Sequence, residues 1–327
     1  MNVAIIGSGS WATALAKIVM HNAREINWHI RKQETIDEFI ENRRNPNHLE
    51  LAYFDTSKIE FSCDINYIIE KSDVLILAIP SPYVKQILDE ITTDLSGKKV
   101  ISAVKGMIAE ENMRVTEYLH TKFNIPHNQI GIVAGPCHAE EIALERLSYL
   151  TIGCVDIEQS KEWCEMMTTK YVHTTPSNDI IGLEVSSVMK NIYAIAMGMC
   201  KSLHYGDNFL AVLLTNAMHE INRFAEASSN IPRDIIHSGY LGDVLVTAYS
   251  NFSRNRQFGQ MIGMGYSVKA AQTEMEMVAE GYYGTKAIHK VNKQLGVDLP
   301  IAEAIYQILY KRKSPKLTIK ELTQKFQ

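Results

Sequence analysis

The chain has 327 residues and a formal net charge of −4, and 46% of its residues are hydrophobic. This length suits two globular domains rather than one. The slightly negative charge gives no support to a general nucleic-acid or anionic-membrane surface, and no uninterrupted apolar run is long enough to predict an integral membrane segment. We therefore expect neither a nucleic-acid partner nor an integral membrane segment.

The cysteines indicate a reducing compartment. Five cysteines are present, which is an odd number, and none of them forms a CxxC pair. We therefore expect reduced thiols, with no disulfide framework and no metal site. Met1 leads straight into a predicted core strand, so we expect no signal peptide and a cytoplasmic location.

The first sixteen residues combine an apolar run, a glycine turn and an alanine-rich segment. Residues 3–6 predict a buried parallel strand, and a helix is predicted after the turn. Gly7 would permit the tight turn, Gly9 would let the backbone approach a pyrophosphate, and Ala12 stands where a third glycine is usual. The helix N-terminus would then face the phosphates. The segment predicts dinucleotide binding, and the alternative is a glycine-rich turn without a ligand.

Residues 26–30 predict a second strand, whose end would face the adenosine ribose. An acidic residue there would bind the 2′-hydroxyl group of NAD. This sequence instead has Arg31 and Lys32, which could contact a 2′-phosphate. We therefore favour NADP over NAD, and the alternative is that both cations are simply solvated.

Apolar strands and helices alternate through the first half of the chain, which predicts a parallel α/β sheet. A polar helix is expected over residues 35–44, a loop over 43–56, a helix over 81–90 and another near His138. Lys105 follows one strand and could reach an anion in a cleft, or it could be a surface lysine. The further strands are expected at residues 59–61, 74–79, 99–104, 130–133, 149–154 and 171–173.

From about Asp179 onward, helical periodicity replaces the strands. The turn-forming residues 175–178 therefore mark a predicted domain boundary. We expect a dinucleotide-binding, Rossmann-like domain over residues 1–178 and an all-helical substrate domain over residues 179–327.

Residues 180–203 predict one long helix, because apolar residues recur at spacings of three or four. Lys190 lies within it among apolar neighbours. Burial of an ammonium group is costly, and it would lower the lysine pKa towards neutrality and make the group usable as an acid or base. The alternative is that the charged end reaches solvent along its methylene stem.

A second polar cluster follows at residues 239–256. Asp243 and Thr247 are four residues apart and would share a helix face, and Asp243 could pair with Lys190 and orient it. Ser253 resembles a helix N-cap, and Arg254 follows it directly. A helix N-terminus beside an arginine suits a phosphate monoester. The alternative is an ordinary capped helix with surface arginines.

Taken together, these segments closely resemble the bacterial NAD(P)H-dependent glycerol-3-phosphate dehydrogenase family, in collinear order over nearly the whole chain. The most diagnostic part is Ser-Asn-x-Ser-Arg-Asn-x-x-Phe-Gly, which begins at Ser250. The other segments that carry the resemblance are Gly7-Ser8-Gly9-Ser10-Trp11, Val104-Lys105-Gly106, Ala134-Gly135-Pro136, Val188-Met189-Lys190-Asn191, Gly242-Asp243 and Glu280-Gly281.

The resemblance implies a Rossmann-like domain followed by an all-α domain, a homodimer, and reduction of dihydroxyacetone phosphate to sn-glycerol 3-phosphate for phospholipid synthesis. The implied cofactor is NADPH, with NADH as a second option. Lys190 is implied as the catalytic acid/base, and we group Asp243 with it. The implied substrate ligands are Lys105, Gly135, Cys137, Lys190, Asp243, Ser253, Arg254 and Asn255. The cofactor contacts, including those expected from the glycine turn and the second strand, are Gly7, Gly9, Ser10, Trp11, Arg31, Lys105, Ala139, Arg254 and Glu280.

The sequence departs from the family pattern at three places. Ala12 replaces the usual glycine and slightly crowds the turn. Cys137 replaces the usual serine, and a thiol is the weaker hydrogen-bond donor, so a substrate contact there would be weakened. Residues 47–61 follow no pattern from which a role can be transferred.

Two other functions fit parts of the sequence. A different dehydrogenase of the same shape would act on a hydroxy acid or a nucleotide sugar, and the nucleotide-sugar version needs a cysteine nucleophile, for which Cys200 is the candidate. A dinucleotide-sensing regulator would need neither Lys190 nor the phosphate cluster.

Overall fold

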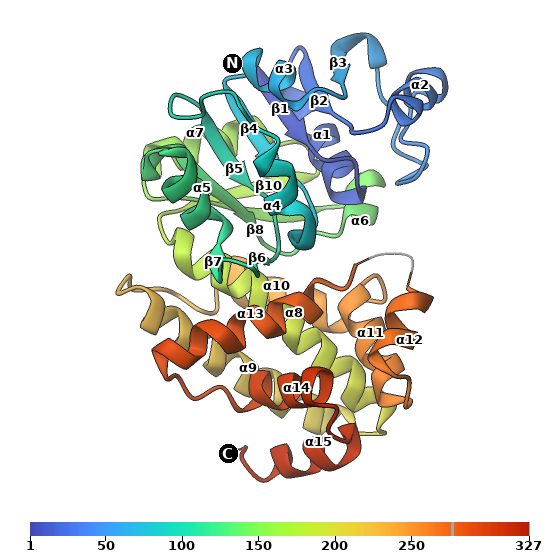
Figure 1. The fold of residues 1–327 in the computed structure, drawn as a ribbon, viewed down its shortest axis with the longest axis vertical. Coiled ribbons are helices and arrows are strands. Elements are labelled where there is room, and N and C mark those ends of the chain that lie inside the picture. Colours follow the sequence, from blue (N-terminus) through green and yellow to red (C-terminus); the bar gives the residue numbers. More distant parts are fainter. Residues whose placement is uncertain (276–277, 327) are drawn as a thin grey trace. The chain divides into compact units, whose positions relative to one another are not determined.

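The computed structural model describes residues 1–275 and 278–326, which fall into two compact units (Figure 1). Unit 1 comprises Met1–Val104 and Arg114–Ile180, and unit 2 comprises Lys105–Met113 and Ile181–Gln327. The segment Lys105–Met113 therefore belongs to unit 2, although it interrupts unit 1 in sequence. The functional division at residues 178 and 179 stays a prediction.

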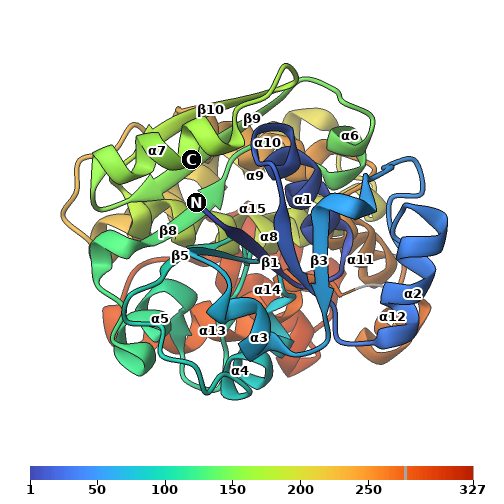
Figure 2. The ribbon, with the colours of Figure 1, turned by 90° about the horizontal axis from the view of Figure 1, so that it is seen from above.

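Unit 1, all of whose residues are described, is built on an eight-stranded sheet in the order β10-β9-β8-β5-β4-β1-β2-β3 (Figure 2). Strand β1 lies between β2 and β4, and Val3 pairs with both Ile26 and Val74. The strand order reverses there, at the position where ligands bind in open α/β sheets. The bounds are β1 (Val3–Ile6), β2 (Ile26–His29), β3 (Ile59–Ser62), β4 (Val74–Leu77), β5 (Lys99–Ser102), β8 (Ile130–Ala134), β9 (Ser148–Cys154) and β10 (Val172–Ser177).

Helices cover both faces of this sheet, which explains why the central strands are continuous apolar runs. Every residue of β1, β4 and β8 is buried. Figure 2 shows α1 and α7 on one side of the sheet and α3, α4 and α5 on the other. The helices of unit 1 are α1 (Ser10–Asn22), α2 (Gln33–Asn42), α3 (Ile65–Glu70), α4 (Ser81–Asp89), α5 (Val115–Phe123), α6 (Ala139–Ala143) and α7 (Ile157–Met167), with short turns η1 (Thr56–Lys58) and η2 (His127–Gln129).

Two details of the sheet correct the sequence-based expectation. Strand β9 runs antiparallel to β8, with Gly131 opposite Cys154, so the sheet is mostly but not wholly parallel. An apolar run predicts a buried strand but carries no information on its direction. The expected boundary turn at residues 175–178 is also wrong in part, because β10 continues through Pro176 to Ser177. Proline is tolerated there since β10 is an edge strand.

Unit 2 is helical and is organised around α8 (Ile180–Ser202), as the sequence predicts. Among the described residues, α8 is the one helix long and apolar enough to cross a membrane by length and hydropathy, but 94% of its most apolar window is buried inside the protein. It is the core helix of unit 2. The other helices are α9 (Asp207–Ser228), α10 (Asp243–Tyr249), α11 (Arg254–Gly263), α12 (Val268–Glu274), α13 (Glu280–Leu295), α14 (Pro300–Lys311) and α15 (Pro315–Thr323), and a π-helical turn, η3 (Ser238–Gly242), precedes α10.

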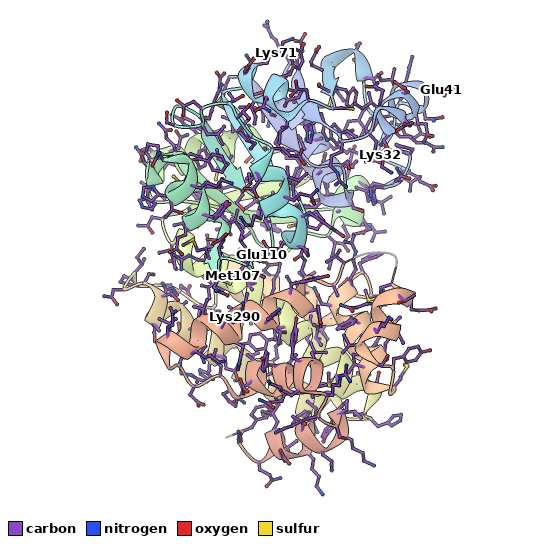
Figure 3. The ribbon with its side chains drawn as sticks, viewed as in Figure 1. Lys32, Glu41, Lys71, Met107, Glu110 and Lys290 are labelled. Carbon is purple, nitrogen blue, oxygen red and sulfur yellow. The ribbon has the colours of Figure 1, made fainter. Side chains whose placement is uncertain are left out.

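The segment Lys105–Met113 joins unit 2 through a small hairpin of β6 (Met107–Ile108) and β7 (Met113–Arg114). Met107 is buried in the same apolar cluster as the core of α8, and β6 contacts α13. Figure 3 labels Met107 on the hairpin and Lys290 on α13. Apolar burial therefore holds this excursion of the chain within unit 2.

Candidate active site

The predicted glycine turn lies between β1 and α1 in unit 1. Gly7 has φ of +127°, and a Cβ there would lie 2.3 Å from the carbonyl oxygen of Ala78. A side chain is excluded on both grounds. Gly9 is the N-cap of α1 with φ of −78°, and a Cβ there would meet no atom within 4 Å. Gly7 therefore serves the fold, whereas Gly9 leaves open space beside the helix N-terminus.

Ala12 does not distort this turn. Its side chain is fully buried, and its Cβ would lie 3.7 Å from a Cβ built on Gly7, which is an ordinary contact distance. The expected crowding is therefore small. At the start of α1, the Trp11 indole donates to the carbonyl of Ala103 at 3.1 Å, and Ser10 is buried.

Arg31 and Lys32 follow β2 and are both exposed, and Figure 3 labels Lys32. His29, the last residue of β2, is buried, and desolvation lowers its pKa, with the positive charge of Arg31 acting in the same direction and a hydrogen bond with the Cys63 backbone opposing it. His29 is thus a neutral core residue at neutral pH. The end of β2 presents two exposed cations, which is the arrangement that suits a 2′-phosphate.

The third predicted part of unit 1 follows β8. Gly135 has φ of +108°, the Cys137 thiol donates to the carbonyl of Gly135 at 3.2 Å, and Ala139 begins α6. Cys137 is buried. Its sulfur is thus engaged with its own turn, and the predicted weak contact with substrate stays a prediction.

In unit 2, Lys190 and Asp243 form a buried ion pair. The Lys190 ammonium group of α8 donates to the Asp243 carboxylate at the start of α10, and their side chains are 2% and 1% exposed. The Thr247 hydroxyl donates to the carbonyl of Asp243 at 2.6 Å. The alternative of a lysine that extends to solvent is therefore wrong. Desolvation of two charges is costly, so a pair of this kind at the centre of a domain is a candidate catalytic feature.

The predicted phosphate cluster begins at Ser253. Ser253 is the N-cap of α11, and its hydroxyl accepts from the backbone N–H of Arg256 at 3.3 Å. Arg254 is the first residue of the helix. The N-cap prediction is confirmed. The arrangement combines a helix N-terminus with an arginine, which together attract a phosphate.

Asn255 is the centre of a buried amide network. Its Nδ2 donates to Oδ1 of Asn191 at 2.9 Å, and its Oδ1 accepts from the backbone N–H of Gly281 at 2.8 Å. Asn191 Nδ2 donates to the carbonyl of Lys105 at 3.0 Å. A Cβ on Gly281 would lie 2.4 Å from the Asn191 carbonyl, so α13 approaches α8 as only glycine permits. This network ties Lys105 and the start of α13, where Glu280 lies, to the turn after Lys190.

The predicted site residues thus form two sets, one within each unit. Within the described parts of the chain, the structure brings together no group of three His, Cys, Asp or Glu side chains that could hold a metal ion. The set in unit 1 comprises Gly7, Gly9, Ser10, Trp11, Arg31, Gly135, Cys137 and Ala139, and the set in unit 2 comprises Lys105, Lys190, Asp243, Ser253, Arg254, Asn255 and Glu280.

Both halves of the chain match models of one protein family. Residues 2–160 match the N-terminal model of NAD-dependent glycerol-3-phosphate dehydrogenase, and residues 179–320 match its C-terminal model. The chain belongs to the NAD-dependent glycerol-3-phosphate dehydrogenase family. The resemblance deduced from the sequence motifs is confirmed.

Relatives of this dehydrogenase family share the full length of the chain. A glycerol-3-phosphate dehydrogenase (NAD(P)+) from Staphylococcus carnosus is 33% identical over 312 residues, which cover 95% of this chain and 94% of the relative. One from Staphylococcus aureus is 31% identical over 99% of this chain and 98% of the relative. The crystal structure of glycerol-3-phosphate dehydrogenase from Coxiella burnetii has a TM-score of 0.89 at 24% identity, covering 99% and 98% of the two chains, and shows the same fold.

As a member of the glycerol-3-phosphate dehydrogenase family, the chain is an NAD(P)-dependent oxidoreductase with NADPH as cofactor and NADH as the alternative. The residues of unit 1 fit such a dinucleotide. Gly9 leaves open space at the N-terminus of α1, and as the N-cap it has no side chain to cap that terminus. The turn can therefore hold the pyrophosphate, and Arg31 stands where a 2′-phosphate would need a cation.

Three residues that contact the candidate site were not identified from the sequence as site residues. Asn191 stands in a quoted motif, but its contacts with Asn255 and Lys105 depend on helix packing that the sequence does not show. Asn45 and His48 lie in the loop before β3, and both contact the glycine turn. A polar loop rich in Asn and Pro is typical of any surface connection, so no local signal distinguishes them.

Proposed function

We propose that the chain reduces dihydroxyacetone phosphate to sn-glycerol 3-phosphate with NADPH, and that the product feeds glycerophospholipid synthesis. The observation that carries this proposal is the buried Lys190–Asp243 pair in unit 2. The same unit contains the capped helix start at Ser253 and Arg254, which suits the phosphate of the substrate. Family membership supports the reaction class.

The reduction consumes one hydride and one proton. When bound, the nicotinamide supplies the hydride to C2 of the substrate. Negative charge then develops on the carbonyl oxygen, and the Lys190 ammonium group stabilises it and donates the proton from Nζ. In the reverse direction, the neutral amine takes the proton from the hydroxyl group. After each reduction Lys190 must take up one proton, which the overall reaction consumes.

Asp243 keeps the Lys190 side chain oriented before substrate binds, because the two groups form a buried ion pair. The Thr247 hydrogen bond to the carbonyl of Asp243 fixes the first turn of α10. The Lys190 side chain, the proposed proton donor, is thus oriented before substrate binds. Less reorganisation of this side chain is then needed to reach the transition state.

The phosphate of the substrate is held away from the reacting carbon. Arg254 and the N-terminus of α11 supply positive charge, and binding energy at the phosphate orients C2. Asn255 is proposed as a substrate ligand from the resemblance. Its amide also joins Asn191 to Gly281, so it holds the cluster together as well.

The nucleotide-sugar alternative is disfavoured by the environment of Cys200. The residue is fully buried in α8, and desolvation raises the pKa of its thiol to about 12. A thiol of this kind is not ionised at neutral pH and is a poor nucleophile. We further propose a cytoplasmic location, in keeping with five free cysteines, and a homodimer, which the family resemblance implies.

A spectrophotometric assay tests the proposal. Oxidation of NADPH and of NADH is followed at 340 nm with dihydroxyacetone phosphate, a 2-keto acid or no second substrate. We expect turnover with dihydroxyacetone phosphate alone and a lower KM for NADPH than for NADH. Turnover with a keto acid in its place, or binding of NADPH without turnover of any substrate, would contradict the proposal.

A further inference from the structure

Side chains from the loop between α2 and β3 contact the glycine turn of unit 1 and the first residue of α1. We propose that this loop, residues 44–53, positions the cofactor: Asn45 fixes the peptide plane of the turn, and His48 holds the Ser10 hydroxyl for the pyrophosphate shared by NADPH and NADH. The proposal rests on the dinucleotide-binding role of the turn.

The loop is closed at its base and is therefore a defined structure. Arg44 pairs with Tyr53 in an antiparallel bridge, and the backbone N–H of Phe54 donates to the carbonyl of Arg43 at 2.8 Å. The Phe54 ring is buried and packs edge-on against Trp28, with ring centroids 5.7 Å apart. The loop is thus anchored in the aromatic core beside β2.

Asn45 reaches from this loop to the turn. Its side chain is 1% exposed, and its Nδ2 donates both to the carbonyl of Ser8 at 2.9 Å and to the Thr13 hydroxyl at 2.8 Å. Its Oδ1 accepts from the backbone N–H of Asn47 at 3.0 Å. A buried amide whose donor and acceptor sides are both used cannot rotate without losing hydrogen bonds.

Three successive carbonyls of the turn are held in this way. Trp28 Nε1 donates to Gly7 O at 2.7 Å, Asn45 holds Ser8 O, and the Thr13 backbone N–H donates to Gly9 O at 3.0 Å. In a planar trans peptide, the N–H points away from the preceding carbonyl. The three fixed carbonyls therefore fix the directions of three successive N–H groups, which is how backbone turns bind anions.

His48 acts on the next residue along the chain. Its Nδ1 lies 3.3 Å from Oγ of Ser10, the first residue of α1. Ser10 is 7% exposed, and His48 is half-buried. This contact fixes the Ser10 side chain at the positive end of the helix, where a phosphate oxygen binds. His48 is accordingly a positioning residue, and it serves the pyrophosphate rather than the 2′-phosphate.

The test measures binding of NADPH and NADH by fluorescence titration in the absence of dihydroxyacetone phosphate, so its outcome does not depend on the identity of the substrate. His48→Leu removes the contact, and His48→Asn keeps a polar atom near the position of Nδ1. We expect His48→Leu to raise the Kd of both dinucleotides about five- to tenfold, and His48→Asn to recover most of the affinity. At saturating NADPH, kcat and the KM for dihydroxyacetone phosphate should be unchanged.

His21→Leu is the matched control, because His21 is exposed and lies in the last turn of the same helix. It should leave both Kd values unchanged. Asn45→Ala should weaken binding more than His48→Leu does, and if that variant does not fold, the two His48 variants decide. An unchanged Kd in His48→Leu would overturn the proposal. If His48→Leu and His48→Asn raised the Kd equally, the role of the Ser10 contact would be overturned. If only the Kd of NADPH rose, His48 would act on the 2′-phosphate, and its role at the pyrophosphate would be overturned.

Discussion

The glycine turn of unit 1 and the Lys190–Asp243 pair of unit 2 differ in how they can stabilise negative charge on a ligand. The turn offers backbone N–H groups and open space beside Gly9, so its charge comes from peptide dipoles that need no counter-ion. Unit 2 instead holds full charges out of water and balances Lys190 with Asp243. The turn therefore needs no balancing charge within the fold, whereas a buried pair does not tolerate the loss of either partner.

The largest effect should come from breaking the buried pair. Lys190→Met should lower kcat by about 10²- to 10⁴-fold, since the acid is lost, while the Kd of NADPH from fluorescence titration stays unchanged. Lys201→Met, an exposed cation at the end of the same helix, is the control and should keep full activity.

Stability and chemistry can be separated with a double variant. Breaking a buried ion pair by removing one partner costs about 3–5 kcal/mol, so the unfolding temperature of Lys190→Met should fall. Lys190→Met with Asp243→Leu should recover that temperature but not kcat. Recovery of kcat in the double variant would show that Lys190 has only a structural role.

The next largest effect should distinguish the two glycines of the turn. Gly7→Ala forces a Cβ to within 2.3 Å of the Ala78 carbonyl at positive φ, and this should lower the free energy of unfolding by about 1–3 kcal/mol.

In Gly9→Ala the added Cβ has no atom within 4 Å, so the variant should change stability by less than about 0.5 kcal/mol. It should nevertheless weaken NADPH binding at least about tenfold, because the methyl group would occupy the space left for the pyrophosphate. Urea unfolding and fluorescence titration measure the two effects, and equal NADPH affinity in Gly9→Ala and the wild type would place the pyrophosphate elsewhere.

A second buried carboxylate in unit 2 should make stability depend on pH. Glu220 is fully buried and accepts from the backbone N–H groups of Ile301 and Ala302 and from the Tyr193 hydroxyl. Burial raises its pKa from the ordinary value of 4.5 to about 7, although these hydrogen bonds and the positive charge of Arg223 oppose the shift. The folded protein therefore keeps the proton of Glu220 to a higher pH than the unfolded chain does.

The free energy of unfolding should accordingly fall as the pH rises from about 4.5 to about 7, because the unfolded chain ionises first. Glu220→Gln should remove this slope. Urea unfolding of both proteins across that range gives the difference between their free energies of unfolding at each pH. The buried His29, whose pKa is lowered by desolvation, contributes a slope of the opposite sign to both proteins, and this contribution cancels in the difference. Parallel curves for the two proteins would contradict the assignment.

The smallest effect should be on cofactor preference. Arg31→Ala should weaken NADPH binding about five- to tenfold and leave NADH nearly unchanged, because the 2′-phosphate alone would lose a charge-assisted contact. Arg24→Ala, an exposed cation before the other end of β2, is the control. Equal losses for the two dinucleotides would show that Arg31 does not discriminate between them.

The sequence predicts the elements whose own residues determine their structure. Val3–Ile6 and Val74–Leu77 are apolar runs buried on both faces, and α8 has the periodicity of a core helix. The direction of β9 was not predicted, because an apolar run does not encode strand direction. The hairpin of β6 and β7 was not predicted either, since strands of two residues lie below the length at which any pattern can be recognised.

The candidate site was predicted unevenly for a related reason. Ser253 was identified because an N-cap is a local feature, and the pairing of Lys190 with Asp243 was raised as an option that the structure confirms. The contacts of Asn45 with the glycine turn join residues 32 and 37 positions apart. Such contacts depend on the packed fold, and an asparagine in a polar loop looks the same with or without them.

The excursion of residues 105–113 into unit 2 has a consequence for biosynthesis. The chain passes between the units three times, after Val104, after Met113 and after Ile180. The ribosome therefore delivers Met107 long before α13, the helix that β6 contacts, has been made. Residues 1–180 therefore fold while Met107 still lacks α13, the helix that β6 contacts in the finished protein, so this part of the hairpin reaches its final burial only late in synthesis.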